Sequence, residues 1–309
     1  MTAKARHDKT IHIKKSLGEK IFDTCNYIFL AVLTLVCLYP MLHVLWASLS
    51  DPLSLMKHSG ILPLPLQPMT LMGYKLTFQN PNILVGYKNT LFLVTVGTFM
   101  NVFFTAMAGY VLSRKTYLWR NIIMAMIVFT MFFGGGMIPT YLLVKNIGLY
   151  NSLWALILPG LVTTYNLIIC RTAMAALPDS LVESGKLDGA NDLIIFIRIA
   201  LPLTKANIAV ITLYYAVSHW NAWFNALIYI RDSDKWPLQL FLRQILIINN
   251  MTDMTDANMQ ASGDADIVFM ARELVQYAVI IVATLPILCI YPFIQKYFVK
   301  GVMVGSLKG

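Results

Sequence analysis

One stretch decides how this chain is read: Leu181-Val-Glu-Ser-Gly-Lys-Leu-Asp-Gly-Ala-Asn-Asp-Leu-Ile-Ile-Phe-Ile-Arg-Ile-Ala-Leu-Pro-Leu203, a charged insert between two apolar segments of membrane length. Glu183 lies near the start of the insert, Gly189 within it and Pro202 near its end. A chain that only crossed lipid would need no structured polar elbow of this length. The insert therefore marks where we expect a partner to dock.

Composition sets the environment of the chain. Of its 309 residues, 58% are hydrophobic and 13% are charged, and the mean hydropathy is +0.65, far from a soluble globular domain. About 20 apolar residues cross roughly 30 Å of hydrocarbon. The sequence predicts an all-α membrane protein with six transmembrane helices in the lipid bilayer, at residues 25–48, 87–112, 121–143, 151–172, 207–230 and 273–294.

The distribution of Lys and Arg predicts the topology. Of the 24 basic residues, six lie in 1–24, three in 113–120, four in 171–206 and three in 295–309, which leaves eight for the opposite side. We therefore expect both termini and the insert to be cytoplasmic. The net charge of +9 follows from this topology, and because the basic residues do not form one patch, no nucleic-acid partner is expected.

The predicted organisation has three parts. A cytoplasmic N-terminal segment (1–24) and a cytoplasmic C-terminal tail (296–309) flank a transmembrane domain (25–295) that carries a cytoplasmic elbow, 178–203, and two external segments, 50–86 and 231–272. Five prolines predict an extended conformation with little helix for the first external segment. The second is acidic and is read as a solvated loop, or as a contact for an external partner. The four cysteines lack metal-ligand spacing, so no metal site is expected.

Local signals divide the elbow into two short helices. Ser180 and Glu183 fit a capping box, Gly189 suits the left-handed residue that ends a helix, and Asn191-Asp192 precede a second helix that Pro202 stops. Small residues in the first helix leave room for another surface to approach. Glu183 either only caps its own helix or also contacts a partner.

The elbow resembles a known family. The pattern Glu-Ser-Gly-x-x-Asp-Gly-Ala, followed by Phe196, Ile199 and Leu201-Pro202, is similar to the EAA loop of membrane subunits of binding-protein-dependent ABC importers, in the carbohydrate-uptake group that includes the maltose permease. Ser184-Gly185 replace two alanines of the family pattern and keep both side chains small. Phe132–Tyr141 and Trp236-Pro-Leu-Gln look like the branch for oligosaccharides and polysaccharide fragments such as aldouronates and alginate, and the tail from Tyr291 also resembles this group.

The resemblance implies a type I ABC importer permease fold in a bacterial cell membrane and a division of labour between subunits. The chain has no Walker-type phosphate loop, so ATP and Mg would be bound by partners. The implied partners are a second homologous permease subunit, two ATP-binding cassette subunits, an extracellular solute-binding protein and a carbohydrate substrate. The implied ATPase-coupling residues are Glu183, Ser184, Gly185, Asp188, Gly189 and Ala190, with Phe196 and Pro202 holding the elbow against the bundle. The glycine-containing tail 301–309 is expected either to reach the ATPase or to be disordered.

Polar residues within the predicted spans mark a candidate substrate path, because such residues are costly in lipid and usually face the bundle interior or water. Tyr214, Ser218, Asn221 and Asn225 share one helical face of the fifth span, Asn101 lies with Thr98 and Thr105 in the second, and Tyr165 and Asn166 lie in the fourth. Hydroxyl, amide and aromatic groups suit an uncharged glycan. The alternative is that these side chains only form hydrogen bonds between helices, and His219 is read as a packing residue.

Two other function classes would each need reactive or ionisable groups at membrane depth. An integral membrane enzyme needs a catalytic constellation at membrane depth, and an ion-driven secondary transporter needs buried ionisable residues. The predicted spans contain almost no carboxylate, Glu273 at an outer edge being the clearest. The sequence therefore favours a transport subunit that is not itself an enzyme.

Overall fold

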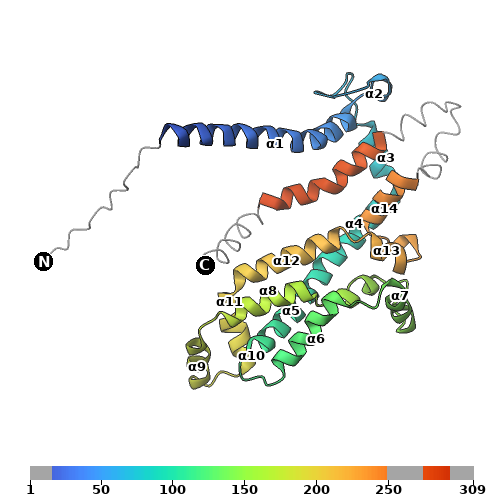
Figure 1. Ribbon diagram of the computed structural model, residues 1–309. Coiled ribbons are helices and arrows are strands. Elements are labelled where there is room, and N and C mark those ends of the chain that lie inside the picture. Colours follow the sequence, from blue (N-terminus) through green and yellow to red (C-terminus); the bar gives the residue numbers. More distant parts are fainter. Residues whose placement is uncertain (1–15, 249–273, 293–309) are drawn as a thin grey trace.

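The computed structural model describes residues 16–248 and 274–292, and across these ranges its regular elements are all helices (Figure 1). The longer helices are α1 (Leu17–Leu49), α4 (Pro81–Phe92), α5 (Thr98–Ser113), α6 (Arg120–Phe132), α8 (Thr164–Ala175) and α12 (Lys205–Trp220). The shorter ones are α2 (Pro52–Lys57), α3 (Met72–Gln79), α7 (Met137–Asn146), α9 (Asp179–Leu187), α10 (Asp192–Ile195), α11 (Leu201–Leu203), α13 (Phe224–Tyr229) and α14 (Leu238–Arg243). π-helical turns occupy η1 (Leu93–Gly97), η4 (Phe196–Ala200) and η6 (Gln244–Ile248), and 3-10 turns occupy η2 (Leu153–Leu156), η3 (Leu158–Gly160) and η5 (Ser233–Lys235).

Three helical runs in the described ranges are long and apolar enough to cross a membrane as single pieces. They are Leu17–Leu49, Pro81–Ser113 and Leu274–Pro292. Three further candidates are bent pairs: Arg120–Phe132 with Met137–Asn146 at 116°, Leu153–Gly160 with Thr164–Ala175 at 49°, and Asp192–Leu203 with Lys205–Trp220 at 84°. The prediction of an all-helical membrane protein is confirmed for this part of the chain, with three clear spans and up to six if each bent pair counts as one.

The third, fourth and fifth predicted spans are not single helices, and the fourth divides into the turns of Leu153–Gly160 and the helix Thr164–Ala175. The third ends at Phe132, and after the left-handed Gly136 (φ 86°) α7 leaves in a new direction. The fifth ends at Trp220, well before residue 230. Glycine takes a positive φ at little cost, so the chain can turn at Gly134–Gly136. Counting apolar residues along the sequence does not reveal such a turn.

The prediction of little helix for 50–86 was also wrong, because α2, α3 and the start of α4 lie there and two of the five prolines begin helices. Pro52 is the first residue of α2, and the Asp51 carboxylate accepts a hydrogen bond from the Ser54 N–H at 2.9 Å. Pro81 similarly begins α4 after Asn80, so the second span starts at 81 and not 87. Proline lacks an N–H and has a helical φ, which suits the first turn of a helix.

The body of the molecule is a bundle in which α5 packs against α8 and α12. Figure 1 shows α9 at one end of this bundle and α7, α13 and α14 at the other. The helix Leu274–Pro292 runs from the α14 end back toward the elbow end (Figure 1). The fold therefore separates the charged elbow from α13 and α14, which follow α12 in the chain.

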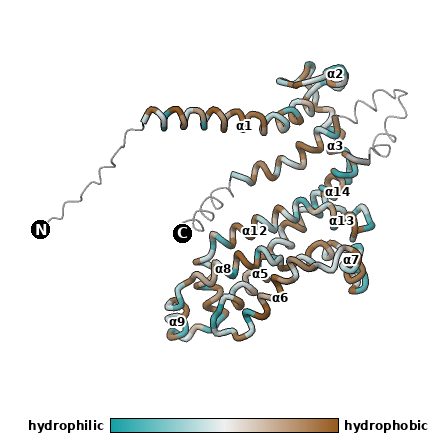
Figure 2. Tube along the Cα trace, viewed as in Figure 1, coloured by the Kyte–Doolittle hydropathy of each residue, from teal (hydrophilic) through white to brown (hydrophobic). Residues whose placement is uncertain are grey.

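α1 projects from the bundle and is mostly apolar along its length (Figure 2). Its apolar window is 0% buried, and it joins the rest of the molecule through its C-terminal part, where the Tyr39 hydroxyl accepts from the Leu62 N–H and Ala47 packs with Leu55, Leu62 and Leu274. A helix that is hydrophobic all round is stable when lipid or protein covers it. The surface of α1 is thus suited to a membrane.

Candidate functional site

The elbow is two short helices joined by a left-handed glycine, as the sequence predicted. Gly189 has φ 80°, and its N–H donates to the Lys186 carbonyl at 3.0 Å, while the Ala190 N–H donates to the Gly185 carbonyl at 2.9 Å. These bonds satisfy carbonyls that the end of α9 leaves free. Asn191 then caps α10, its side chain accepting from the Ile194 N–H at 2.8 Å.

The predicted capping box at Ser180 and Glu183 was wrong. Pro178 is the residue that precedes α9, without a side-chain cap, and Ser180 lies inside the first turn. Proline at 178 fixes the entry of the chain, and the helix begins at Asp179, two residues earlier than a cap at Ser180 would allow. Consequently the Glu183 carboxylate is not used to cap its own helix.

Close packing attaches α9 to the next helix. Gly185 is buried, and a Cβ added there would lie 3.1 Å from Ile199 Cδ1 and 3.4 Å from Ile195 Cγ1. Phe196 is buried and its ring centroid is 5.2 Å from that of Tyr110 on α5. Phe196 thus packs against the bundle as expected, whereas Pro202 is exposed and does not make that contact.

A sharp bend connects the elbow to α12. The run Asp192–Leu203 meets α12 at 84°, and Thr204 at the corner is buried, with its hydroxyl donating to the Ala200 carbonyl at 2.7 Å. The helix continues to Leu203, one residue past the proline that was expected to stop it. The second helical run of the elbow therefore leads directly into α12 through a bend, and the hydrogen bond of Thr204 lies at that bend.

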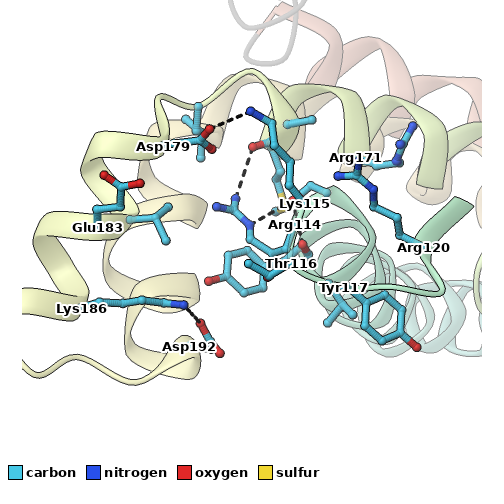
Figure 3. A pocket seen from close by; sticks show the side chains of 17 residues that line it. Arg114, Lys115, Thr116, Tyr117, Arg120, Arg171, Asp179, Glu183, Lys186 and Asp192 are labelled. Atoms are coloured by element: carbon cyan, nitrogen blue, oxygen red, sulfur yellow. Dashed lines mark hydrogen bonds and ion pairs between the residues drawn. The ribbon is translucent and has the colours of Figure 1, made fainter.

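A charged cavity of about 580 Å³ lies beside the elbow (Figure 3). Its charged lining residues are Arg114, Lys115, Arg120, Arg171, Lys186, Asp179, Glu183 and Asp192. Two of the carboxylates have partners: Lys115 Nζ is 2.7 Å from Asp179 Oδ2, and Lys186 Nζ is 3.6 Å from Asp192 Oδ1. The hydrogen bond and the charge of Lys115 lower the pKa of Asp179.

Glu183 differs from the other two carboxylates of this cavity. Its side chain is exposed, and within the described part of the chain it has no hydrogen bond or ion pair. Ser184, Asp188 and Gly189 are also exposed, whereas Ala190 is half-buried. The structure thus presents Glu183 beside a basic cavity, free to bond with a group from outside the chain.

The elbow also has an apolar tip that the sequence reasoning missed. Leu187 is 89% exposed and lies next to Asp188 at the end of α9. Burying an exposed leucine is worth roughly 1.5–3 kcal/mol. The signal was available in the sequence, because a leucine directly before the Asp-Gly pair lies at the end of a short polar helix, where the bundle core does not cover it.

The fifth-span residues predicted to line a substrate path do not lie on one helical face. Tyr214 is half-buried and Ser218 is exposed on α12, but the helix ends at Trp220, so exposed Asn221 lies after its end and exposed Asn225 lies on α13. The single helical stripe is therefore a wrong prediction. Tyr165 is 55% exposed, and its ring centroid is 6.0 Å from that of Tyr214.

Asn101 lies inside the bundle, where it connects three segments. Its amide donates to the carbonyls of Gly160 and Leu161, each at 2.9 Å, and its Oδ1 is 2.7 Å from Nε2 of buried His219. Because an amide oxygen only accepts, Nε2 of His219 carries the proton of this bond. Asn101 thus satisfies backbone groups where the Leu153–Ala175 run is broken. Asn166 is also buried.

A second interaction at the same break involves Tyr215, which the sequence reasoning missed. Its hydroxyl accepts from the Thr163 N–H at 3.0 Å and is 2.8 Å from the Thr105 hydroxyl. Tyr215 and His219 are four residues apart on α12, the spacing of neighbours on one helical face. Together they fix α12 to α5 and to the break, and His219 is a packing residue as predicted.

Comparison with known proteins places the whole chain in one group. The sequence profile of the family described as "Binding-protein-dependent transport system inner membrane component" matches residues 14–304. Protein LplC of Bacillus subtilis is 41% identical over 301 residues, covering 97% of this chain and 98% of that protein. The "Polygalacturonan/rhamnogalacturonan transport system permease protein YtcP" of the same organism is 41% identical over 295 residues, covering 95% and 100%.

A solved structure has the same fold. It is a chain of a bacterial ABC transporter "involved in the import of the acidic polysaccharide alginate", with a TM-score of 0.85 and 28% sequence identity, covering 93% of this chain and 99% of that one. The "Arabinooligosaccharides transport system permease protein AraQ" of B. subtilis is 28% identical over 286 residues, covering 91% of this chain and 94% of that protein.

Proposed function

Since the chain belongs to the family of binding-protein-dependent transport system inner membrane components, we propose that it forms one half of the membrane path of an ATP-driven oligosaccharide importer. The chain is a carbohydrate permease subunit of an ABC importer and not an enzyme. Its structural neighbour covers nearly its full length. The observation that carries the coupling part of the proposal is the exposed elbow helix α9, with Glu183 free to accept bonds from outside.

The proposed complex contains four kinds of partner. A second homologous permease subunit covers the apolar surface that this chain leaves exposed, and two ATP-binding cassette subunits bind ATP and Mg below the elbow. An extracellular solute-binding protein delivers the sugar at the α7, α13 and α14 end. In support, family members depend by description on a binding protein, and α9 and α14 lie at opposite ends of the bundle.

The proposed substrate is an oligosaccharide that carries uronic acid residues. One relative is described as a polygalacturonan/rhamnogalacturonan permease and one structural neighbour comes from an alginate importer. Galacturonan and alginate are both polymers of uronic acids, whose carboxylates are ionised at neutral pH. This proposal replaces the uncharged glycan that polar groups in the spans had suggested.

The proposed topology has six membrane crossings in a bacterial cell membrane, with both termini and the elbow in the cytoplasm. Three crossings are single helical runs and three are the bent pairs. The basic residues at 113–120 and 171–206 support a cytoplasmic position for the elbow end. The tail 296–309 lies outside the described residues, as do 1–15 and 249–273, so the proposed reach of 301–309 to the ATPase rests on the resemblance alone.

The coupling proposal is tested by reversing one charge on α9. In cells that express the intact importer, Glu183→Lys is expected to abolish sugar uptake while the permease stays in the membrane at its normal level, because the carboxylate is lost and a further cation is added to the basic cavity. Asp234→Lys applies the same charge change to an exposed residue at the other end of the bundle and is expected to leave the association with the ATPase subunits unchanged. Normal uptake and normal ATPase association in the Glu183 variant would refute the assignment.

A further inference from the structure

A second cavity lies at the opposite end of the bundle from the elbow cavity. It has a volume of about 490 Å³ and lies between α14, the break that follows α12 and the helix Leu274–Pro292. Its polar and aromatic lining consists of Trp223, Gln239, Arg243 and Thr284, and the rest is aliphatic. None of these four residues belongs to the coupling site.

Arg243 is the one cationic residue among those that line this cavity. Its guanidinium carbon is 4.9 Å from the centroid of the Trp223 ring, and the side chain is half-buried. Across the described residues, no hydrogen bond or ion pair engages its five N–H donors. A charged group next to membrane-spanning helices is costly unless it meets an acceptor or water, so this guanidinium is suited to an anion.

Arg243 is not needed to anchor α14. Leu238, Phe241 and Leu242 of that helix are buried, and the Leu238 N–H donates to the Thr90 hydroxyl at 2.9 Å. The stacking of Arg243 on Trp223 is a weak cation–π contact where it is exposed. The helix is thus positioned by its apolar face, which leaves the guanidinium available at the edge of the cavity.

The combination of side chains matches one chemical class of ligand. A tryptophan face accommodates the apolar side of a pyranose ring, and a guanidinium binds a carboxylate through two parallel hydrogen bonds. The half-buried amide of Gln239 can donate to and accept from sugar hydroxyls. Binding sites for small ligands typically combine such an apolar wall with a few placed polar groups.

From this geometry we propose that the Trp223–Arg243 cavity is a binding subsite for a uronate residue of the incoming oligosaccharide, with Arg243 on the carboxylate and Trp223 under the ring. The subsite rests on the proposed import of acidic oligosaccharides and names the residues that would recognise the acid. Arg243 is then a specificity determinant, because a neutral sugar gains nothing from the guanidinium.

The test compares an acidic ligand with its neutral ester. Initial uptake of trigalacturonate is measured in cells with the intact importer, and binding of trigalacturonate and of its methyl ester is measured on the purified complex. Arg243→Gln is expected to weaken binding and uptake of the acid by roughly tenfold to a hundredfold, the range for charge-assisted hydrogen bonds, and to leave binding of the ester unchanged. Arg231→Gln removes an exposed cation of the same external segment outside the cavity and is the matched control.

The outcomes separate the subsite from the function it rests on. If the unaltered importer takes up no trigalacturonate, the proposed substrate is wrong and the subsite falls with it. If uptake occurs but the Arg243→Gln and Arg231→Gln variants bind and take up trigalacturonate equally well, the subsite alone is refuted. Equal loss of acid and ester binding in Arg243→Gln would assign Arg243 a structural role and would also overturn the proposal.

Discussion

Replacing Asn101 with alanine tests whether the broken span is held by side-chain hydrogen bonds. The amide side chain bonds to two carbonyls at 2.9 Å and to His219 at 2.7 Å. Hydrogen bonds between membrane helices contribute about 0.6 kcal/mol each on average, so three of them amount to roughly 2 kcal/mol. Because the variant also leaves buried polar groups unpaired, which costs more than the bond itself, we expect the free energy of unfolding to fall by at least about 2 kcal/mol.

The assay is unfolding of the purified full chain by SDS in mixed micelles, followed by helix content. The control is Asn146→Ala, because Asn146 ends α7 with an exposed amide that has no hydrogen bond within the described ranges. Surface substitutions of this kind change stability by less than about 0.5 kcal/mol. If Asn101→Ala also stays within about 0.5 kcal/mol of the unaltered chain, the bonds at Gly160 and Leu161 do not hold the break.

Two further predictions concern the elbow. Gly189→Ala is expected to lower the free energy of unfolding by about 1 kcal/mol. Gly189 has φ 80° and an added Cβ would meet nothing within 4 Å, so the penalty comes from backbone conformation alone. Gly134→Ala is the control, because Gly134 is equally open but has no positive φ; it should be neutral, and equal losses in the two variants would contradict this explanation. Lys115→Gln is expected to return the lowered pKa of Asp179 toward its ordinary value, as measured by carboxylate NMR titration. Since the folded-state pKa is depressed, the stabilisation from this pair is present above the ordinary pKa and is lost as pH falls through the lowered one, and the variant should lack that pH dependence; an unchanged titration would show that Lys115 is not the cause.

Local features of the fold were readable from the sequence because local interactions produce them. Gly189 and Asn191 act within one or two turns of the chain, and both occupy the positions their chemistry predicted. Apolar length likewise identified the first and last spans. Pro52 and Pro81 were misread because proline disfavours the interior of a helix but favours its first turn, and the sequence alone did not show which applied.

The breaks in the spans depend on contacts between distant segments. The run 153–175 is interrupted where Asn101 and Tyr215, some 50 residues or more away in sequence, satisfy its backbone groups. A periodic pattern of polar residues cannot reveal that its helix stops, so Asn221 and Asn225 were assigned to a face that ends at Trp220. The same limit hid the cavity at Trp223 and Arg243, which forms from three segments that only the fold brings together.

The position of α12 gives a physical route between the two proposed sites. Its 16 residues, about 24 Å at 1.5 Å per residue, begin at the bent corner of the elbow and end at the break that precedes Trp223. In between, Tyr215 and His219 fix the helix to α5. If the proposed push on α9 moves α12, then α5 moves with it or the hydrogen bonds from Tyr215 and His219 to α5 break. Because Asn101 and Tyr215 also bond to the interrupted span, movement of the elbow and rearrangement of the break are expected to be coupled in transport.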